Sequence, residues 1–82
     1  MAYKLLIVED EKEKATGIAY LTGKYNPECR PVLLAHDGRE GYEKATAEQP
    51  DIIVTDIRMP EMDGLEMIRE LKKAGCSAEF IA

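Results

Sequence analysis

The sequence lacks the features of a membrane-spanning or secreted chain. Its most apolar runs, residues 5–8 and 52–54, are far shorter than the roughly 20 residues that a membrane-spanning helix needs. The acidic residues 9–11 follow the first run too closely to leave room for the apolar core of a signal peptide. We therefore expect a cytoplasmic chain that does not enter a membrane.

Positive charge is scarce. Lys and Arg together number 11 against 16 Asp and Glu, and the formal net charge is −5. A nucleic-acid-binding domain normally carries a basic face or stripe, and an acidic chain is repelled by anionic lipid. We therefore expect no direct nucleic-acid binding by this segment and no membrane docking.

Cysteine, histidine and glycine-rich turns are also sparse. Cys29 and Cys76 lack the spacing of a zinc site or of a disulfide framework, so we expect two reduced thiols in or near the core. His36 is the one histidine, and we expect it to face solvent in a loop. Acidic residues 9–11 occupy the turn where a dinucleotide-binding domain would need glycines, which argues against that class.

Apolar runs alternate with helical patterns over 82 residues, a length that suits one domain. Strands are predicted over residues 4–8, 31–35, 52–56 and 78–82. Pro31 cannot donate a hydrogen bond, so the second strand is placed at a sheet edge. This order predicts an α/β layer fold with a parallel sheet and right-handed crossovers, whose ligands bind beyond the carboxyl ends of the strands.

Two helix starts carry the spacing of a capping box. Asp37 precedes Glu40 by three residues, and Asp63 precedes Glu66 in the same way. The helix after Asp63 is predicted to bury residues 65, 68 and 71, and Gly75 is placed at its left-handed C-terminal cap.

Three carboxylates follow two of the predicted strands. Glu9 and Asp10 come after the first strand, and Asp56 ends the third, so parallel pairing would bring them together. Close carboxylates require either a bound proton or a neutralising cation, and oxygen ligands suit Mg²⁺. A carboxylate such as Asp56 can also act as a nucleophile and form an acyl phosphate. The alternative is that these residues are polar strand ends that face water.

Residues 50–64, PDIIVTDIRMPEMDG, are similar to the phosphorylation-site segment of response-regulator receiver domains of two-component signalling. Residues 5–11, LLIVEDE, resemble the first strand and acidic pair of that family. The resemblance implies a three-layer, flavodoxin-like fold with strand order 2-1-3-4. Residues 56–60 and 65–69 look most like receivers attached to AraC-type DNA-binding domains, which regulate transcription.

The resemblance also implies roles for individual residues. Asp56 would accept a phosphoryl group from a histidine kinase. Asp10, Asp56 and the backbone carbonyl of Arg58 would bind Mg²⁺ directly, and Glu9 would act through a bound water. Such a domain assists its own phosphotransfer and is otherwise not an enzyme. A haloacid-dehalogenase-type hydrolase would need an acid at the position of Arg58.

Pro60 and Gly64 are expected to shape the loop after Asp56, since proline fixes its own φ and glycine permits a tight turn. Met59 and Met62 are expected to pack within that loop.

The chain departs from a complete receiver at its end. It stops in the fourth strand, so we interpret residues 1–82 as the N-terminal part of the domain, with the fifth strand and last helices missing. The family's switch Ser or Thr and its fifth-strand Lys are missing with them, so we expect no protein cation to compete for the carboxylates. A truncated receiver that serves as a non-switching scaffold is the alternative function.

Residues 78–82 would form an open sheet edge, which predicts a homodimer or oligomer through that strand.

Overall fold

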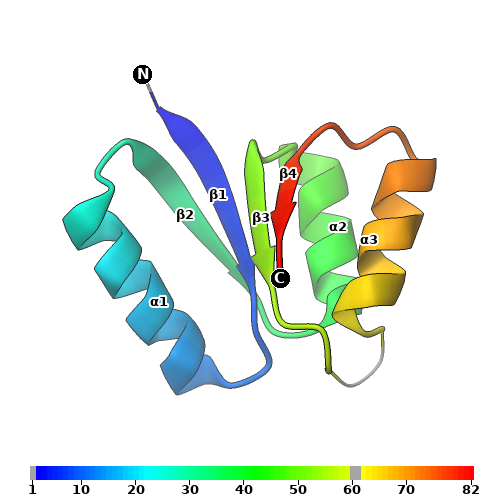
Figure 1. Cartoon of the computed structure of the whole chain (residues 1–82), viewed down its shortest axis with the longest axis horizontal. Coiled ribbons are helices and arrows are strands. Elements are labelled where there is room, and N and C mark those ends of the chain that lie inside the picture. Colours follow the sequence, from blue (N-terminus) through cyan, green and yellow to red (C-terminus); the bar gives the residue numbers. More distant parts are fainter. Residues whose placement is uncertain (1, 60–61) are drawn as a thin grey trace.

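The computed structural model describes residues 2–59 and 62–82, in which strands and helices alternate (Figure 1). The elements in chain order are β1 (Tyr3–Val8), α1 (Lys12–Tyr25), β2 (Cys29–Ala35), α2 (Gly38–Glu48), β3 (Ile52–Thr55), α3 (Gly64–Lys73) and β4 (Glu79–Ile81). Each predicted strand is present. β2 begins before Pro31, β3 ends one residue before Asp56, and β4 is shorter than predicted.

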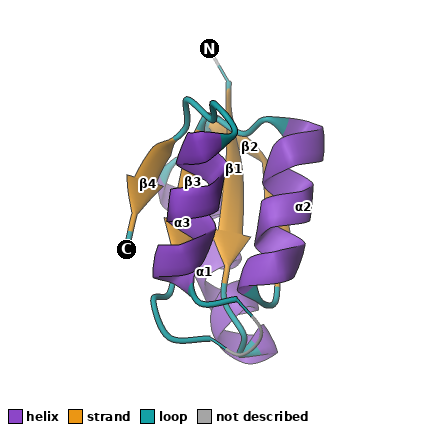
Figure 2. Ribbon diagram, turned by 90° about the vertical axis from the view of Figure 1, so that its right-hand side faces the viewer, coloured by secondary structure: helices purple, strands orange, loops and turns teal. Residues whose placement is uncertain are grey.

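The four strands form one parallel sheet in the order β2-β1-β3-β4. α1 lies on one face of the sheet, and α2 and α3 lie side by side on the other (Figures 1 and 2). The predicted flavodoxin-like fold and strand order 2-1-3-4 are therefore confirmed, and so is the edge position of the strand that contains Pro31.

The main core lies between the sheet and the α2–α3 layer. Alternate strand residues point into it, and Leu6, Val8 and Ile53 are fully buried there against Met67 and Leu71 of α3. Each such side chain contributes about 1.5–3 kcal/mol through removal of its apolar surface from water. This layer therefore fixes the carboxyl ends of β1 and β3 relative to each other.

The predicted inner face of α3 is partly wrong. Leu71 is buried and Ile68 packs against the core, but Leu65 is 47% exposed and Met67, which the prediction omitted, is completely buried. Gly41 on α2 explains why α3 is rotated so that Met67, and not Leu65, faces the core. A Cβ atom at Gly41 would lie 2.6 Å from Met67 Sδ and 2.9 Å from Val8 Cγ2, so the glycine leaves the space that the methionine fills.

The helix ends follow the predicted capping residues. The Asp37 carboxylate accepts a 2.8 Å hydrogen bond from the Glu40 amide, and Asp63 accepts the same bond from Glu66. The Glu40 carboxylate accepts a 2.8 Å hydrogen bond from the His36 amide and not from the Asp37 amide. The second bond of this capping box therefore reaches one residue closer to the N-terminus than in the usual motif. Gly75 has φ +85°, as predicted for the cap that follows α3.

Two sequence-based expectations about membranes and thiols can be compared with the fold. Among the described residues, no helix is long and apolar enough to cross a membrane. Cys29 and Cys76 are half-buried free thiols, and Cys76 packs against the core, as expected.

Candidate functional site

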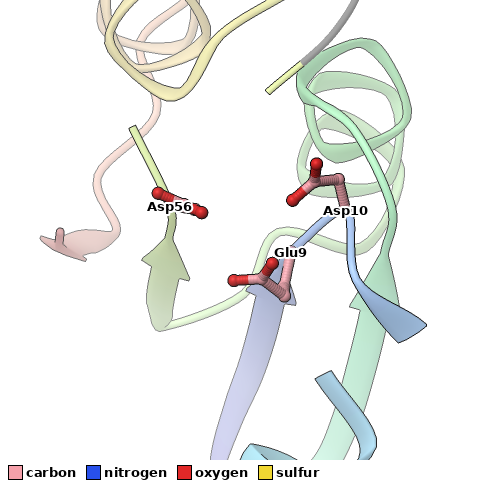
Figure 3. Close-up of side chains that lie close together, drawn as sticks. All are labelled: Glu9, Asp10 and Asp56. Atoms are coloured by element: carbon pink, nitrogen blue, oxygen red, sulfur yellow. The ribbon is translucent and has the colours of Figure 1, made fainter. Parts of the chain in front are cut away.

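Three carboxylates converge at the carboxyl ends of β1 and β3 (Figure 3). The two strands pair in register with Val8 opposite Thr55, so Glu9 and Asp56 continue neighbouring strands side by side. One carboxylate oxygen each from Glu9, Asp10 and Asp56 lies within 4.8 Å of the others. The structure thus brings together the three residues that the sequence singled out.

Backbone hydrogen bonds fix the site beyond the strand ends. The Asp56 amide donates to the Val8 carbonyl at 3.1 Å, and the Glu9 amide donates to the Ala35 carbonyl at 2.9 Å. The buried Thr55 hydroxyl donates to the Asp56 carbonyl at 2.8 Å. Both acidic residues are therefore held by the sheet itself, with little freedom to move apart.

The N-terminus of α3 presses directly against Asp56. The Gly64 amide donates a 2.8 Å hydrogen bond to the Ile57 carbonyl, and a Cβ atom at Gly64 would lie only 2.1 Å from the Asp56 carbonyl oxygen. Glycine is therefore required where the helix meets the backbone of Asp56. This contact gives Gly64 the loop-shaping position predicted for it, whereas Pro60 lies outside the described residues.

The electrostatics of the cluster favour a cation. Burial raises the pKa of Glu9, and the neighbouring carboxylates of Asp10 and Asp56 raise it further. The hydrogen bond from the Glu11 amide and the charge of the Lys14 ammonium act in the opposite direction and lower the pKa of Glu9. Since Glu9 is only 4% exposed, its negative charge is costly without a compensating positive charge.

Lys14 corrects one sequence-based expectation. Its ammonium lies 3.8 Å from Glu9 Oε1, so a protein cation does stand beside the carboxylates. Lys14 occupies the first turn of α1, immediately after the loop that carries Asp10. Lys14 follows the acidic pair by about one helical turn, and this spacing could have predicted the ion pair with Glu9.

Other predicted residues lie around the cluster. His36 lies in the loop after β2, as expected, but it is half-buried and its Nδ1 lies 3.4 Å from the Glu9 carbonyl, so it does not simply face solvent. Met59 and Met62 pack against the core at the edge of the loop, as expected. Arg58 is exposed in that loop, and the role of its carbonyl stays a prediction.

The donor set fits Mg²⁺. All three side chains offer carboxylate oxygens, the ligand type that Mg²⁺ prefers, and the exposed Asp10 leaves the cluster open to solvent and to a second reactant. Zinc would favour nitrogen or sulfur ligands, and the described cluster has none.

The family model of the response regulator receiver domain matches residues 5–82. The chain belongs to this family. Among curated relatives of this receiver domain, the uncharacterized transcriptional regulatory protein YesN of Bacillus subtilis is 37% identical over 79 residues. The alkaline phosphatase synthesis transcriptional regulatory protein PhoP of the same organism is 36% identical over 73 residues.

Solved structures agree with this assignment. The N-terminal domain of an uncharacterized protein from Wolinella succinogenes superposes with a TM-score of 0.87 at 37% identity. A chemotaxis response regulator of Vibrio cholerae gives a TM-score of 0.82 at 27% identity, and the match covers 92% of this chain and 60% of that one. The receiver domain of a response regulator is a signalling domain.

The matches cover nearly all of this chain but only part of its relatives. They span 96% of this chain and 22% of YesN, and 89% of this chain and 29% of PhoP. Against the Wolinella structure the match covers 96% of this chain and 61% of that chain.

Proposed function

We propose that this receiver domain accepts a phosphoryl group on Asp56 from a histidine kinase, with Mg²⁺ bound at the acidic cluster. An Asp56 carboxylate oxygen attacks the phosphorus, the phosphorus–nitrogen bond to the kinase histidine breaks, and an acyl phosphate forms on Asp56. The observation that carries the proposal is the convergence of Glu9, Asp10 and Asp56 at the carboxyl edge of the sheet.

Asp56 is the member of the cluster best suited to attack. Glu9 is buried, accepts a 3.1 Å hydrogen bond from the Glu11 amide and pairs with Lys14. Across residues 2–59 and 62–82, the Asp56 carboxylate has no such partner, and Asp56 is partly accessible. Its nucleophilic oxygen is therefore free to meet a phosphoryl donor.

Asp10, Asp56 and the backbone carbonyl of Arg58 would hold Mg²⁺ directly, and Glu9 would act through a water molecule. When bound, Mg²⁺ supplies positive charge against the transferring phosphoryl oxygens. Calorimetric titration with MgCl₂ tests this assignment. The Asp10→Asn variant should lose most of the heat of binding, whereas an isotherm equal to that of the unsubstituted chain would reject the site.

Labelling with acetyl phosphate and Mg²⁺ tests the phosphoacceptor. Mass spectrometry should detect one phosphoryl group, located on Asp56, and none on the Asp56→Asn variant. Asp51→Asn is the matched control, because Asp51 lies at the opposite end of β3 and its carboxylate binds the Lys4 amide. Equal labelling of Asp56→Asn would refute the proposal. A folded protein that takes up no label would favour the non-switching scaffold.

We propose that residues 1–82 are the N-terminal part of a receiver domain, which is supported by matches that cover only 61% and 60% of two solved chains. We also propose that the domain lies in the cytoplasm. The AraC-type subfamily remains a prediction from residues 56–60 and 65–69.

We also propose self-association through β4. This strand forms one edge of the sheet, and Ile81 on it is 53% exposed. Pairing with a second copy would satisfy edge hydrogen bonds and cover apolar surface. Light scattering should detect a dimer or larger oligomer at micromolar concentration that Ile81→Lys weakens. A monomer at high micromolar concentration would refute this proposal.

A further inference from the structure

Lys14 reaches the acidic cluster from outside the set of metal-binding residues. Its ammonium lies 3.8 Å from Glu9 Oε1, and its side chain lines the same hollow as Glu9, Thr55 and Asp56. The Lys14 side chain is 57% exposed and the Glu9 side chain only 5% exposed. The lysine is therefore the solvated partner of this ion pair, and the glutamate is the buried one.

Other lysines near this end of the sheet are engaged or directed elsewhere. Lys44 lies 3.4 Å from Glu40 on α2. Lys12 lines a hollow with Glu11, Glu13 and Lys14 itself and does not line the one that holds Glu9 and Asp56. Among the described residues, Lys14 is the one whose ammonium is within ion-pair distance of the cluster. It supplies one positive charge against the negative charges of three carboxylates.

We infer that Lys14 is a positioning residue that lowers the affinity of the acidic cluster for Mg²⁺ by serving as the counter-charge of Glu9 in the ion-free state. The inference rests on the proposed Mg²⁺ site. A divalent ion held by the cluster and the Lys14 ammonium would repel each other, because the ammonium lies only 3.8 Å from Glu9 Oε1. This repulsion weakens ion binding, and the long, exposed side chain of Lys14 leaves room for the ammonium to move away from Glu9.

This arrangement makes the cluster less dependent on the metal for its stability. Without Lys14, the ion-free protein would hold Glu9 buried beside two further carboxylates with less compensation. With Lys14, part of that repulsion is already relieved before Mg²⁺ arrives, so the metal gains less on binding. The expected consequence is a weaker and more readily reversed Mg²⁺ site.

Titration with MgCl₂ in a calorimeter tests the inference on four variants of the chain. Lys14→Gln removes the charge, and Lys14→Glu reverses it. Lys14→Arg keeps the charge, and Lys12→Gln removes an equal charge from the same helix turn. Lys14→Gln should bind Mg²⁺ about three- to fivefold more tightly than the unsubstituted chain, because a partly exposed ion pair is worth up to about 1 kcal/mol. Lys14→Glu should bind more tightly still, and the other two variants should stay near the original affinity.

Salt and thermal stability give readouts that a purely structural role would not move. The advantage of Lys14→Gln should shrink as the ionic strength rises, because salt screens the exposed ammonium. Mg²⁺ should also raise the melting temperature of Lys14→Gln more than that of Lys12→Gln.

The role of Lys14 and the existence of the Mg²⁺ site can fail separately. Equal Mg²⁺ affinities for Lys14→Gln and Lys12→Gln, with clear binding in the unsubstituted chain, would overturn the role of Lys14 and leave the metal site standing. Weaker binding by Lys14→Gln would overturn it as well. An absence of Mg²⁺ binding in the unsubstituted chain and in every variant would overturn the metal site and the inference together.

Discussion

Gly64→Ala tests whether the start of α3 positions Asp56. The new Cβ atom would lie 2.1 Å from the Asp56 carbonyl oxygen and 3.0 Å from Ile57 Cα. Both are backbone atoms, so no flexible side chain can move aside, and hydrogen bonds from the Asp56 amide to Val8 and from the Gly64 amide to Ile57 hold this stretch of backbone in place. The backbone of Asp56 and Ile57 must therefore shift relative to the start of α3.

The expected magnitude follows from this clash. Overpacking of a well-packed site costs about 1–3 kcal/mol, and alanine recovers at most about 1 kcal/mol as a better helix former. A contact this short against backbone belongs at the upper end of that range, so we expect a net loss of about 2 kcal/mol. For a domain of this size, that loss lowers the melting temperature by about 8–16 °C.

Thermal unfolding followed by circular dichroism measures the effect, and acetyl phosphate labelling measures the displacement of Asp56. Gly17→Ala is the matched control, because a Cβ at Gly17 meets nothing within 4 Å in the interior of α1. That variant should gain about 0.5–1 kcal/mol and label normally. If Gly64→Ala matched Gly17→Ala in both stability and labelling, the argument for a positioned Asp56 would be refuted.

Three further predictions concern the frame of the site. Met67→Ala removes a fully buried side chain, so urea unfolding should show a loss of about 2–5 kcal/mol. Asp37→Ala removes the acceptor of the Glu40 amide, so the same assay should show a loss of about 1 kcal/mol. The His36 amide, and then Lys44, hold the pKa of Glu40 below its usual value. Glu40 therefore stabilises the fold above its usual pKa, and this contribution disappears as pH falls through the lowered value. Glu40→Gln should flatten that acid limb of the stability profile, and an unchanged limb would contradict the hydrogen-bond assignment.

The layer order and the convergence of the acidic residues could be predicted because they depend on patterns within short segments. Each strand appears in the sequence as an apolar run bounded by turn residues. Carboxylates that follow parallel strands meet at the same edge of the sheet. The strand order 2-1-3-4 came from the family resemblance and not from periodicity. The capping aspartates were found because a cap involves residues only three apart.

Lys14 could have been found from its spacing, but two other errors concern contacts between segments far apart in the chain. Met67 is buried and Leu65 exposed because the phase of α3 is set by the space at Gly41 on α2, which lies far from α3 in the sequence. His36 turns toward the Glu9 carbonyl because β1 and β2 are adjacent in the sheet. No local pattern encodes such contacts.

Glu9, Asp10 and Asp56 are proposed to form one phosphoacceptor site. The most direct measurement is a pair of amide NMR spectra with Mg²⁺, recorded without and with beryllofluoride as a stand-in for the phosphoryl group. We expect the largest shifts at residues 8–10 and 55–58 and small shifts at Lys4 and Asp51, which lie at the opposite ends of the same strands. We expect no beryllofluoride response in Asp56→Asn. Shifts centred on the opposite strand ends, or an equal response from Asp56→Asn, would contradict this proposal.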